Sequence, residues 1–219
     1  MIDALIPVWK PVGWTSFDVV KKLRSQIKPT KVGHAGTLDP FAEGVLILCT
    51  GKYTKQVESF MDKEKEYLAG MQLGDETDTL DPTGKVVETA DVPRLSQDDI
   101  NLVLKEFIGE IKQEPPMFSA LKINGQPLYK LARKGIKFPR KNRAVIIYDI
   151  QLINFTDRTI TFKVVCGRGT YIRSLAKDIA ENLNTVGHLA SLKRTRIGEY
   201  NQSSCIAVKD LSRWISART

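Results

Sequence analysis

A glycine-rich segment directly before an apolar run constrains the fold of this chain more than any other feature. Residues 33–40 read Gly-His-Ala-Gly-Thr-Leu-Asp-Pro, and residues 45–49 read Val-Leu-Ile-Leu-Cys. Two glycines within four residues permit backbone angles that other residues avoid, which predicts a tight loop. The apolar run predicts a short, buried strand. The pattern therefore places a histidine, His34, and a carboxylate, Asp39, on a constrained loop at the edge of a core strand.

On its own, this loop admits two interpretations. Functional side chains are often carried on loops that a rigid scaffold positions. Equally, an Asp-Pro pair is typical of a plain polar turn, in which Asp39 accepts hydrogen bonds from backbone N–H groups. The residues of the loop leave both interpretations open, and the rest of the chain has to decide between them.

The charge balance of the chain favours a polyanionic partner. Among its 219 residues, 33 are Lys or Arg and 25 are Asp or Glu, which gives a net charge of +8. Nucleic acid is the first candidate for such a partner, although a basic surface without any partner has the same composition. Hydrophobic residues make up 42 % of the chain, which is enough for a packed core.

The chain offers few groups for a metal or a disulfide. It has two histidines and three widely spaced cysteines without a Cys-x-x-Cys pair, which argues against a zinc site and fits a reducing compartment. The acidic segment 74–82 lacks the spacing of a calcium loop, and we expect it to be a solvated excursion. The Gly-Lys pair at 51–52 lacks the spacing of a nucleotide-binding loop. We therefore expect neither a metal nor a cofactor.

No segment of the sequence indicates export or membrane insertion. The N-terminus lacks the basic and apolar regions of a signal peptide. No apolar run approaches the ~20 residues that a membrane span requires. We therefore expect a cytoplasmic protein that does not associate with a membrane.

Local patterns predict both strands and helices in the first half of the chain. Residues 5–9 and 65–73 are expected strands, and residues 52–61 are an expected short helix. Thr15 or Ser16 is expected to cap another helix. The apolar face of that helix is expected to hold Phe17, Val20, Leu23 and Ile27. Alternation in the second strand places on one face Tyr67, Ala69, Met71 and Leu73.

In the second half, a helix is expected between Ser96 and Gly109, and a β-hairpin over residues 144–166. A further helix follows a glycine loop and carries Arg173 in its first turn, where the helix dipole disfavours a cation, so the position hints at an anionic partner. His188 is expected at a helix end, and residues 207–216 form an expected last helix. These elements predict an α+β fold with a twisted, mainly antiparallel sheet flanked by helices.

The segment 117–143 mixes basic and aromatic side chains. This mixture suits a strand-like or hairpin arm that lies on RNA phosphates and bases. A solvated, mobile loop is the other interpretation. The residues concerned are Lys122, Lys130, Arg133, Lys134, Lys137, Arg140, Lys141 and Arg143, interleaved with Phe118, Tyr129 and Phe138.

Five motifs extend over nearly the whole chain. They read Lys10-Pro11-x-Gly13-x-x-Ser16, Gly33-His34-x-Gly36-x-Leu38-Asp39-Pro40-x-Ala42-x-Gly44-Val45-Leu46, Lys65-x-Tyr67, Met117-x-Ser119-Ala120-Leu121-Lys122 and Gly169-Thr170-Tyr171-Ile172-Arg173. In these residues and in this order the chain resembles the bacterial TruB family of tRNA pseudouridine synthases. One departure is Trp9, which stands where the family usually has Asp before Lys-Pro.

The resemblance implies a function. The family isomerises uridine 55 in the tRNA T-loop to pseudouridine without metal or cofactor. It has the pseudouridine synthase fold, with the active site in a cleft across the sheet and a mobile thumb loop, which corresponds here to about 117–143. The implied partner is therefore tRNA, bound through its T-stem-loop.

The resemblance also implies roles for particular residues. Asp39 is the implied catalytic carboxylate, Tyr67 stacks on the flipped base and is a possible proton acceptor, and Arg173 pairs with Asp39. Leu192 walls the pocket, and His34 fills space in the opened T-loop. The remaining substrate-binding residues implied by the matching motifs are Lys10, Gly36, Lys122 and Tyr171.

The chemistry of the reaction agrees with these residue types. The N1–C1′ bond must break, the uracil must turn, and C5 must bond to C1′, with no redox step and no phosphate energy. A carboxylate can attack C1′ or take a proton from the sugar, and the sequence leaves both open. The target base has to be flipped out of the folded tRNA, which costs a few kcal/mol.

We expect residues 1–219 to form a single catalytic domain and the protein to be a monomer. Typical members continue into a small C-terminal RNA-binding (PUA) domain, which is expected to be absent because the sequence stops at Thr219. Two other functions remain open. One is a non-catalytic RNA-binding or tRNA-folding module, and the other is a base-excising hydrolase, since carboxylates also cleave glycosidic bonds.

Overall fold

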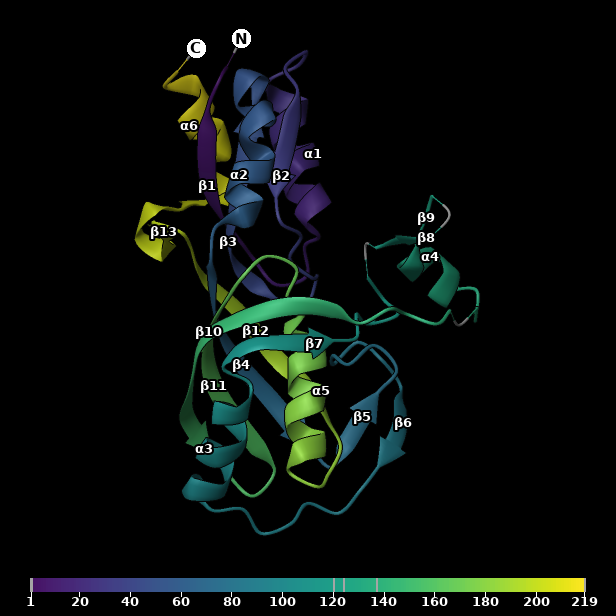
Figure 1. The fold of residues 1–219 in the computed structure, drawn as a ribbon. Coiled ribbons are helices and arrows are strands. Elements are labelled where there is room, and N and C mark those ends of the chain that lie inside the picture. Colours follow the sequence, from purple (N-terminus) through teal and green to yellow (C-terminus); the bar gives the residue numbers. More distant parts are fainter. Residues whose placement is uncertain (1, 120, 124, 137, 219) are drawn as a thin grey trace. The chain divides into compact units, whose positions relative to one another are not determined.

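The computed structural model describes residues 2–119, 121–123, 125–136 and 138–218. The chain divides into two compact units, of which the first holds residues 1–68 and 192–219 and the second holds residues 69–191. Helices and a mainly antiparallel mixed sheet make the fold α+β, as predicted (Figure 1). None of the described helices is both long and apolar enough to cross a membrane.

The strands of the first unit follow the order β14-β1-β3-β12, of which β12 begins in the second unit. β1 runs antiparallel to β3, and β12 runs parallel to β3, with Arg194 opposite Gly44. β2 pairs with β3 beyond that point, with His34 opposite Leu48. β13 extends β12. These strands are β1 (Leu5–Lys10), β2 (Val32–Ala35), β3 (Glu43–Thr50), β12 (Gly187–Ile197), β13 (Tyr200–Asn201) and β14 (Ile206–Ala207).

Helices cover both faces of these strands. On one face, α1 (Ser16–Gln26) and α6 (Leu211–Ser216) bury apolar side chains against β1 and β3. On the other, Phe60 of α2 (Val57–Asp62) packs with Val45, Ile47 and Cys49 of β3. β3 is therefore buried on both sides, which explains why its residues 45–49 are all apolar. The 3₁₀ turns of this unit are η1 (Gly51–Gln56), η2 (Gln202–Ser204) and η3 (Val208–Asp210).

The strands of the second unit follow the order β4-β11-β10-β7, of which β4 begins in the first unit. α3 (Gln97–Glu106) packs against β10, and α5 (Ile172–Asn182) contacts α3 and, through an ion pair between Lys177 and Glu76, the β5–β6 hairpin (Figure 1). The strands are β4 (Lys65–Leu73), β5 (Asp75–Thr77), β6 (Val86–Thr89), β7 (Gly109–Gln113), β10 (Arg143–Phe155) and β11 (Thr159–Cys166). Residues 117–143 contribute β8 (Lys122–Ile123), β9 (Gln126–Pro127) and α4 (Leu128–Ala132).

Several local predictions are confirmed. Thr15 caps α1 in a capping box with Asp18, and Ser96 caps α3 in the same way with Asp99. β4 has the predicted bounds, and its four alternating apolar residues from Tyr67 to Leu73 are all buried. The hairpin of β10 and β11 is present as expected. Local signals of two or more agreeing kinds therefore located these elements.

Other local predictions are wrong. His34 lies on β2 rather than in the loop, because its segment pairs with β3, and the tight turn begins only at Gly36, where φ is +85°. Phe17 is 61 % exposed, since the buried side of α1 is formed by Ser16, Val19, Val20 and Leu23. His188 lies on β12 and not at a helix end. Residues 52–61 begin as a 3₁₀ turn, and the last α-helix begins at Leu211.

Candidate active site

Asp39 lies half-buried in the loop of residues 36–42, which joins β2 to β3. The N–H of Ala42 donates to the Asp39 carbonyl at 3.1 Å, and the N–H of Gly13 donates to the Pro40 carbonyl at 2.7 Å. Ser16, the first residue of α1, accepts from the N–H of Leu38 at 2.9 Å and donates to the Leu38 carbonyl at 3.2 Å. The backbone on either side of Asp39 is therefore tied to neighbouring elements.

Lys10, at the end of β1, contacts the far end of this loop. Its side chain is fully buried, and the ammonium donates to the carbonyls of Pro11 at 3.0 Å, Trp14 at 2.6 Å and Ala42 at 2.6 Å. The pKa of Lys10 is lowered to about 8, first by burial and then by the nearby Arg194, while the Asp39 carboxylate acts in the opposite direction. All three hydrogen bonds of Lys10 thus run to main-chain carbonyls. A role of Lys10 in substrate binding stays a prediction.

Arg194 on β12 also contacts the loop, and the sequence did not predict this contact. The side chain is 1 % exposed. Its Nε donates to the Val45 carbonyl at 2.7 Å, its Nη2 to that of Gly36 at 3.2 Å and its Nη1 to that of Thr37 at 3.4 Å. The available signal was the position of Arg194 two residues after Leu192, which marks the inward face of a strand that was not expected there.

His34 and Gly36 lie beside this contact. Burial lowers the pKa of the His34 imidazole, and the Arg194 guanidinium lowers it further, which favours the neutral ring. Gly36 uses its carbonyl to accept from Arg194. Tyr67 on β4 and Leu192 on β12 are both buried, at 8 % and 7 % exposure. The substrate roles of these four residues stay predictions.

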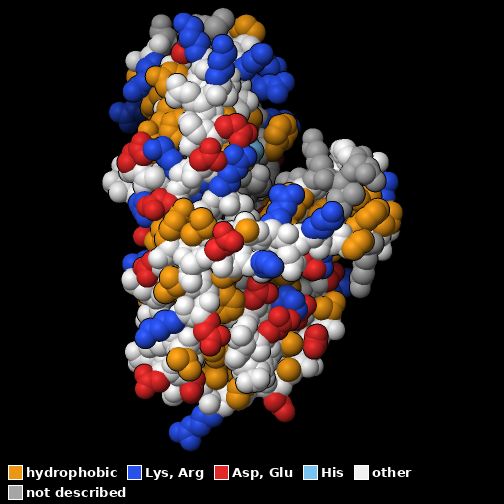
Figure 2. All heavy atoms as spheres, in the orientation of Figure 1, with side chains coloured by type: hydrophobic (Ala, Val, Ile, Leu, Met, Phe, Trp, Pro, Cys, Tyr) orange, Lys and Arg blue, Asp and Glu red, His pale blue; other side chains and the backbone are white. Residues whose placement is uncertain are grey.

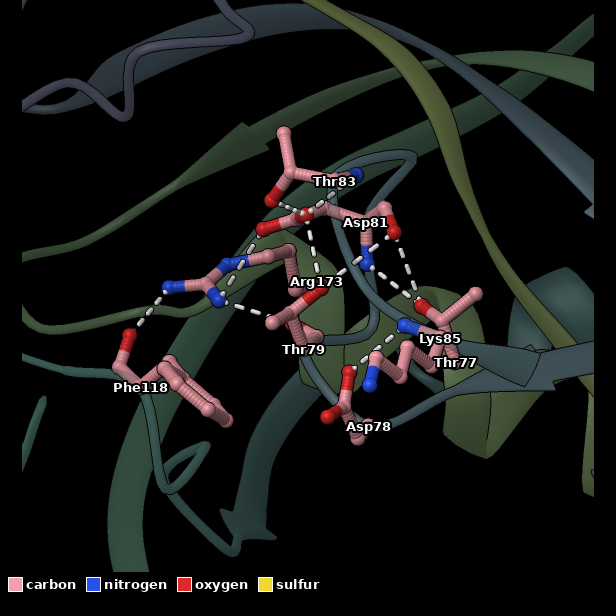
Figure 3. Close-up of polar contacts among 8 residues, drawn as sticks. All are labelled: Thr77, Asp78, Thr79, Asp81, Thr83, Lys85, Phe118 and Arg173. Atoms are coloured by element: carbon pink, nitrogen blue, oxygen red, sulfur yellow. Dashed lines mark hydrogen bonds and ion pairs between the residues drawn. The ribbon is translucent and has the colours of Figure 1, made fainter. Parts of the chain in front are cut away.

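Arg173 lies in a second cluster, in the first turn of α5 (Figure 3). It is 4 % exposed, and its Nη1 is 3.3 Å from Oδ2 of Asp81 and 2.8 Å from the Thr79 carbonyl. Its Nη2 donates to the Phe118 carbonyl at 2.8 Å. The expected anionic partner of Arg173 is thus at least in part a side chain of the same chain.

Asp81 corrects the prediction that segment 74–82 is solvated. The residue is 5 % exposed. Its Oδ1 accepts from the hydroxyl of Thr79 at 2.7 Å and from the N–H and hydroxyl of Thr83 at 3.0 and 2.6 Å. Hydrogen bonds and an arginine offset the cost of burying a carboxylate, and composition alone does not reveal such partners.

The predicted ion pair between Asp39 and Arg173 stays a prediction, since Asp39 belongs to the first unit and Arg173 to the second. Tyr171, the residue before α5, donates its N–H to Gln113 Oε1 at 2.7 Å. Lys122 lies on β8, and residues 120, 124 and 137 of the predicted thumb fall outside the described residues. Across the described ranges, no group of three or more His, Cys, Asp or Glu side chains is arranged to hold a metal ion.

Known protein families and curated relatives match this chain along most of its length. The model of the TruB family pseudouridylate synthase N-terminal domain matches residues 24–172, and that of the tRNA pseudouridylate synthase B C-terminal domain matches residues 173–219. A tRNA pseudouridine synthase B from Clostridium kluyveri is 48 % identical over 96 % of this chain and 72 % of its own length. One from Phocaeicola vulgatus is 44 % identical over 94 % of this chain and 90 % of its own length.

Solved structures give the same result for the fold. A chain in the crystal structure of a Cbf5-Nop10-Gar1 complex matches with a TM-score of 0.74 and 33 % identity, over 96 % of this chain and 54 % of that one. A chain in an H/ACA RNP bound to a substrate RNA containing 2′-deoxyuridine matches with a TM-score of 0.71 and 29 % identity, over 98 % and 55 %. This chain spans about half the length of both. With a family model over most of its residues and relatives this similar, the chain belongs to the TruB family of pseudouridylate synthases.

Proposed function

We propose that this chain isomerises uridine 55 in the T-loop of tRNA to pseudouridine, with Asp39 as the catalytic carboxylate. As a TruB family member it is an isomerase that makes pseudouridine in tRNA. The geometry of its loop supports the assignment of Asp39. The residue is half-buried, it occupies the Asp position of the family motif, and hydrogen bonds hold the backbone on both sides of it. The net charge of +8 suits a polyanionic substrate.

The reaction exchanges one bond to the ribose for another. The N1–C1′ bond of the uridine breaks, the uracil turns within the site, and C5 bonds to C1′. The proton on C5 then leaves, and N1 carries a proton in the product. Asp39 either attacks C1′ and is later displaced, or removes a proton from the sugar, and both routes need a carboxylate held against the ribose.

Several other residues contribute to the proposed site. Tyr67 stacks on the flipped uracil and offers its hydroxyl, and Leu192 forms an apolar wall. Arg173 pairs with Asp39 and fixes its direction. The guanidinium of Arg173 also contacts Asp81, with its Nη1 3.3 Å from Oδ2. His34 fills space that the flipped base leaves in the T-loop. The proposed location is the cytoplasm, and the proposed partner is the T-stem-loop of tRNA.

The basic surface favours one alternative, a tRNA-binding or tRNA-folding module without turnover. Figure 2 shows Lys and Arg side chains gathered over the first unit. Exposed basic residues there include Lys21, Arg24, Lys28 and Lys31. Such a surface binds RNA without any chemistry. Turnover therefore has to be measured directly.

The test is release of tritium from tRNA labelled at C5 of its uridines, with excess enzyme. Wild-type protein is expected to release one tritium per tRNA. Asp39→Asn keeps the shape of the side chain and removes its charge, so the rate is expected to fall at least ~1,000-fold, while the Kd for tRNA changes by less than about threefold.

Asp91→Asn is the matched control, because Asp91 is an exposed aspartate of the second unit. It is expected to react at the wild-type rate. Turnover by Asp39→Asn at the wild-type rate would reject the carboxylate assignment. Tight binding without tritium release by the wild-type protein would favour the binding module, and free uracil in the mixture would favour a hydrolase.

A further inference from the structure

The loop that carries Asp39 is held at its two ends by two buried cations. Arg194 contacts the carbonyls of Gly36 and Thr37 at the start of the loop, and Lys10 contacts the carbonyl of Ala42 at its end. We propose that Arg194 is a positioning residue that sets the place of the Asp39 carboxylate by fixing the backbone before it. This inference rests on the proposed role of Asp39 in catalysis.

The first support for the proposal is the set of acceptors that the Arg194 guanidinium contacts. The three hydrogen bonds of its guanidinium run to main-chain carbonyls, one at the start of β3 and two in the loop. Within the part of the chain that the structure describes, no Asp or Glu forms an ion pair with Arg194. A buried cation without a counter-charge is costly, so fold stability alone gives little reason to place one here.

The second support is the way the other end of Arg194 is fixed. The backbone of Arg194 pairs with Gly44 of β3. A Cβ on Gly44 would lie 2.2 Å from the Arg194 carbonyl oxygen, and φ of Gly44 is +125°. Only glycine permits this close approach, so the strands meet at the point from which the Arg194 side chain reaches the loop. The side chain thus connects a fixed strand backbone to a turn.

The third support is the place of these contacts relative to Asp39. Thr37 and Gly36 lie two and three residues before it. Gly36 has a positive φ, and glycine has more conformational freedom than other residues because it lacks a Cβ. Ser16 holds Leu38, the residue between. A catalytic group displaced by about 1 Å loses on the order of 100-fold in rate, so a tether at the start of the turn acts directly on catalysis.

The test compares Arg194→Met, Arg194→Lys and a matched control, Arg196→Met. Arg196 lies two residues further along β12 and pairs at the surface with Glu64. Single-turnover tritium release is expected to fall about 100-fold in Arg194→Met, with an unchanged Kd for tRNA. Arg194→Lys keeps the cation and reaches fewer carbonyls, so it is expected to lie between Arg194→Met and the wild type. Arg196→Met is expected to match the wild type.

Amide hydrogen exchange provides a readout that does not depend on activity. Peptides covering residues 36–44 are expected to exchange faster in both Arg194 variants, and peptides from α3 are expected to be unchanged. If Arg194→Met does not fold, Arg194→Lys alone decides. If Arg194→Met folds, the proposal is overturned when both variants keep the wild-type rate or the wild-type exchange of the loop. If Arg194→Met does not fold, either of these results in Arg194→Lys overturns the proposal. Absence of turnover in the wild-type protein instead overturns the proposed function.

Discussion

At the scale of single residues, Lys10 shows how a buried charge is accommodated and at what cost. Its ammonium is satisfied by three carbonyls, yet burial and Arg194 still lower its pKa to about 8. The unfolded chain binds that proton up to about its ordinary value of 10.5. Between these two pKa values the unfolded state holds more protons than the folded state, so the free energy of unfolding rises with pH.

This predicts a specific difference between the wild-type protein and Lys10→Met. The free energy of unfolding of the wild-type protein is expected to rise, relative to that of Lys10→Met, as the pH increases from about 8 toward 10.5, and to show no such trend at neutral pH and below. Urea unfolding of both proteins at each pH measures it. Parallel pH dependences of the two proteins would contradict the lowered pKa of Lys10.

At the scale of elements, the approach of β12 to β3 depends on Gly44. The parallel ladder between these strands pairs Lys193 with Glu43 and Arg194 with Gly44. A side chain on Gly44 meets backbone atoms of Arg194, which have no flexible end that could move aside. The pairing of β12 with β3 is therefore sensitive to any side chain at Gly44, and the apolar run of β3 gives no sign of this.

Gly44→Ala is expected to lower the free energy of unfolding by about 3 kcal/mol or more, through backbone strain and the clash together. Gly109→Ala is the control, since Gly109 also has a positive φ, +108°, but a Cβ there meets nothing within 4 Å. It is expected to cost only about 1–2 kcal/mol of strain. Urea unfolding of the two variants gives both values, and equal losses would show that strain alone explains the effect at Gly44.

The elements also show which parts of the fold the sequence predicts. α1, α3 and β4 combine caps or strict alternation with apolar periodicity, and their positions were predicted closely. β12 was missed because its basic residues, from Lys193 to Arg196, conceal the alternation of buried positions. Asp81 and Arg194 were missed for a related reason, since the cation that contacts Asp81 and the carbonyls that accept from Arg194 lie far away in sequence.

At the scale of the whole molecule, the net charge of +8 suits a polyanionic substrate, and we expect tRNA binding to depend on salt. Each phosphate neutralised by a Lys or Arg releases counterions, so the Kd rises steeply with ionic strength. Basic side chains on α1, Lys21 and Arg24 among them, lie on the helix whose first residue, Ser16, contacts the loop of Asp39. We expect these side chains to contact tRNA phosphates.

Replacing Lys21 and Arg24 together by Gln is expected to weaken tRNA binding and to reduce the slope of log Kd against log salt by about 1 for each phosphate that is no longer neutralised. Lys85 and Lys105, which are exposed on the second unit, provide the matched double variant. Titrations at several KCl concentrations measure the slopes. Identical slopes in the two double variants would exclude a specific role of α1 in phosphate binding.

Lys10 and Arg194 hold the Asp39 loop through hydrogen bonds to main-chain carbonyls, and every residue has such a carbonyl. The hydrogen bonds that hold this turn therefore do not depend on which side chains it presents to solvent. Thr37 presents its side chain to solvent while its carbonyl is held by Arg194. We therefore expect that changes to the exposed side chains of this loop leave the place of the Asp39 carboxylate unaltered.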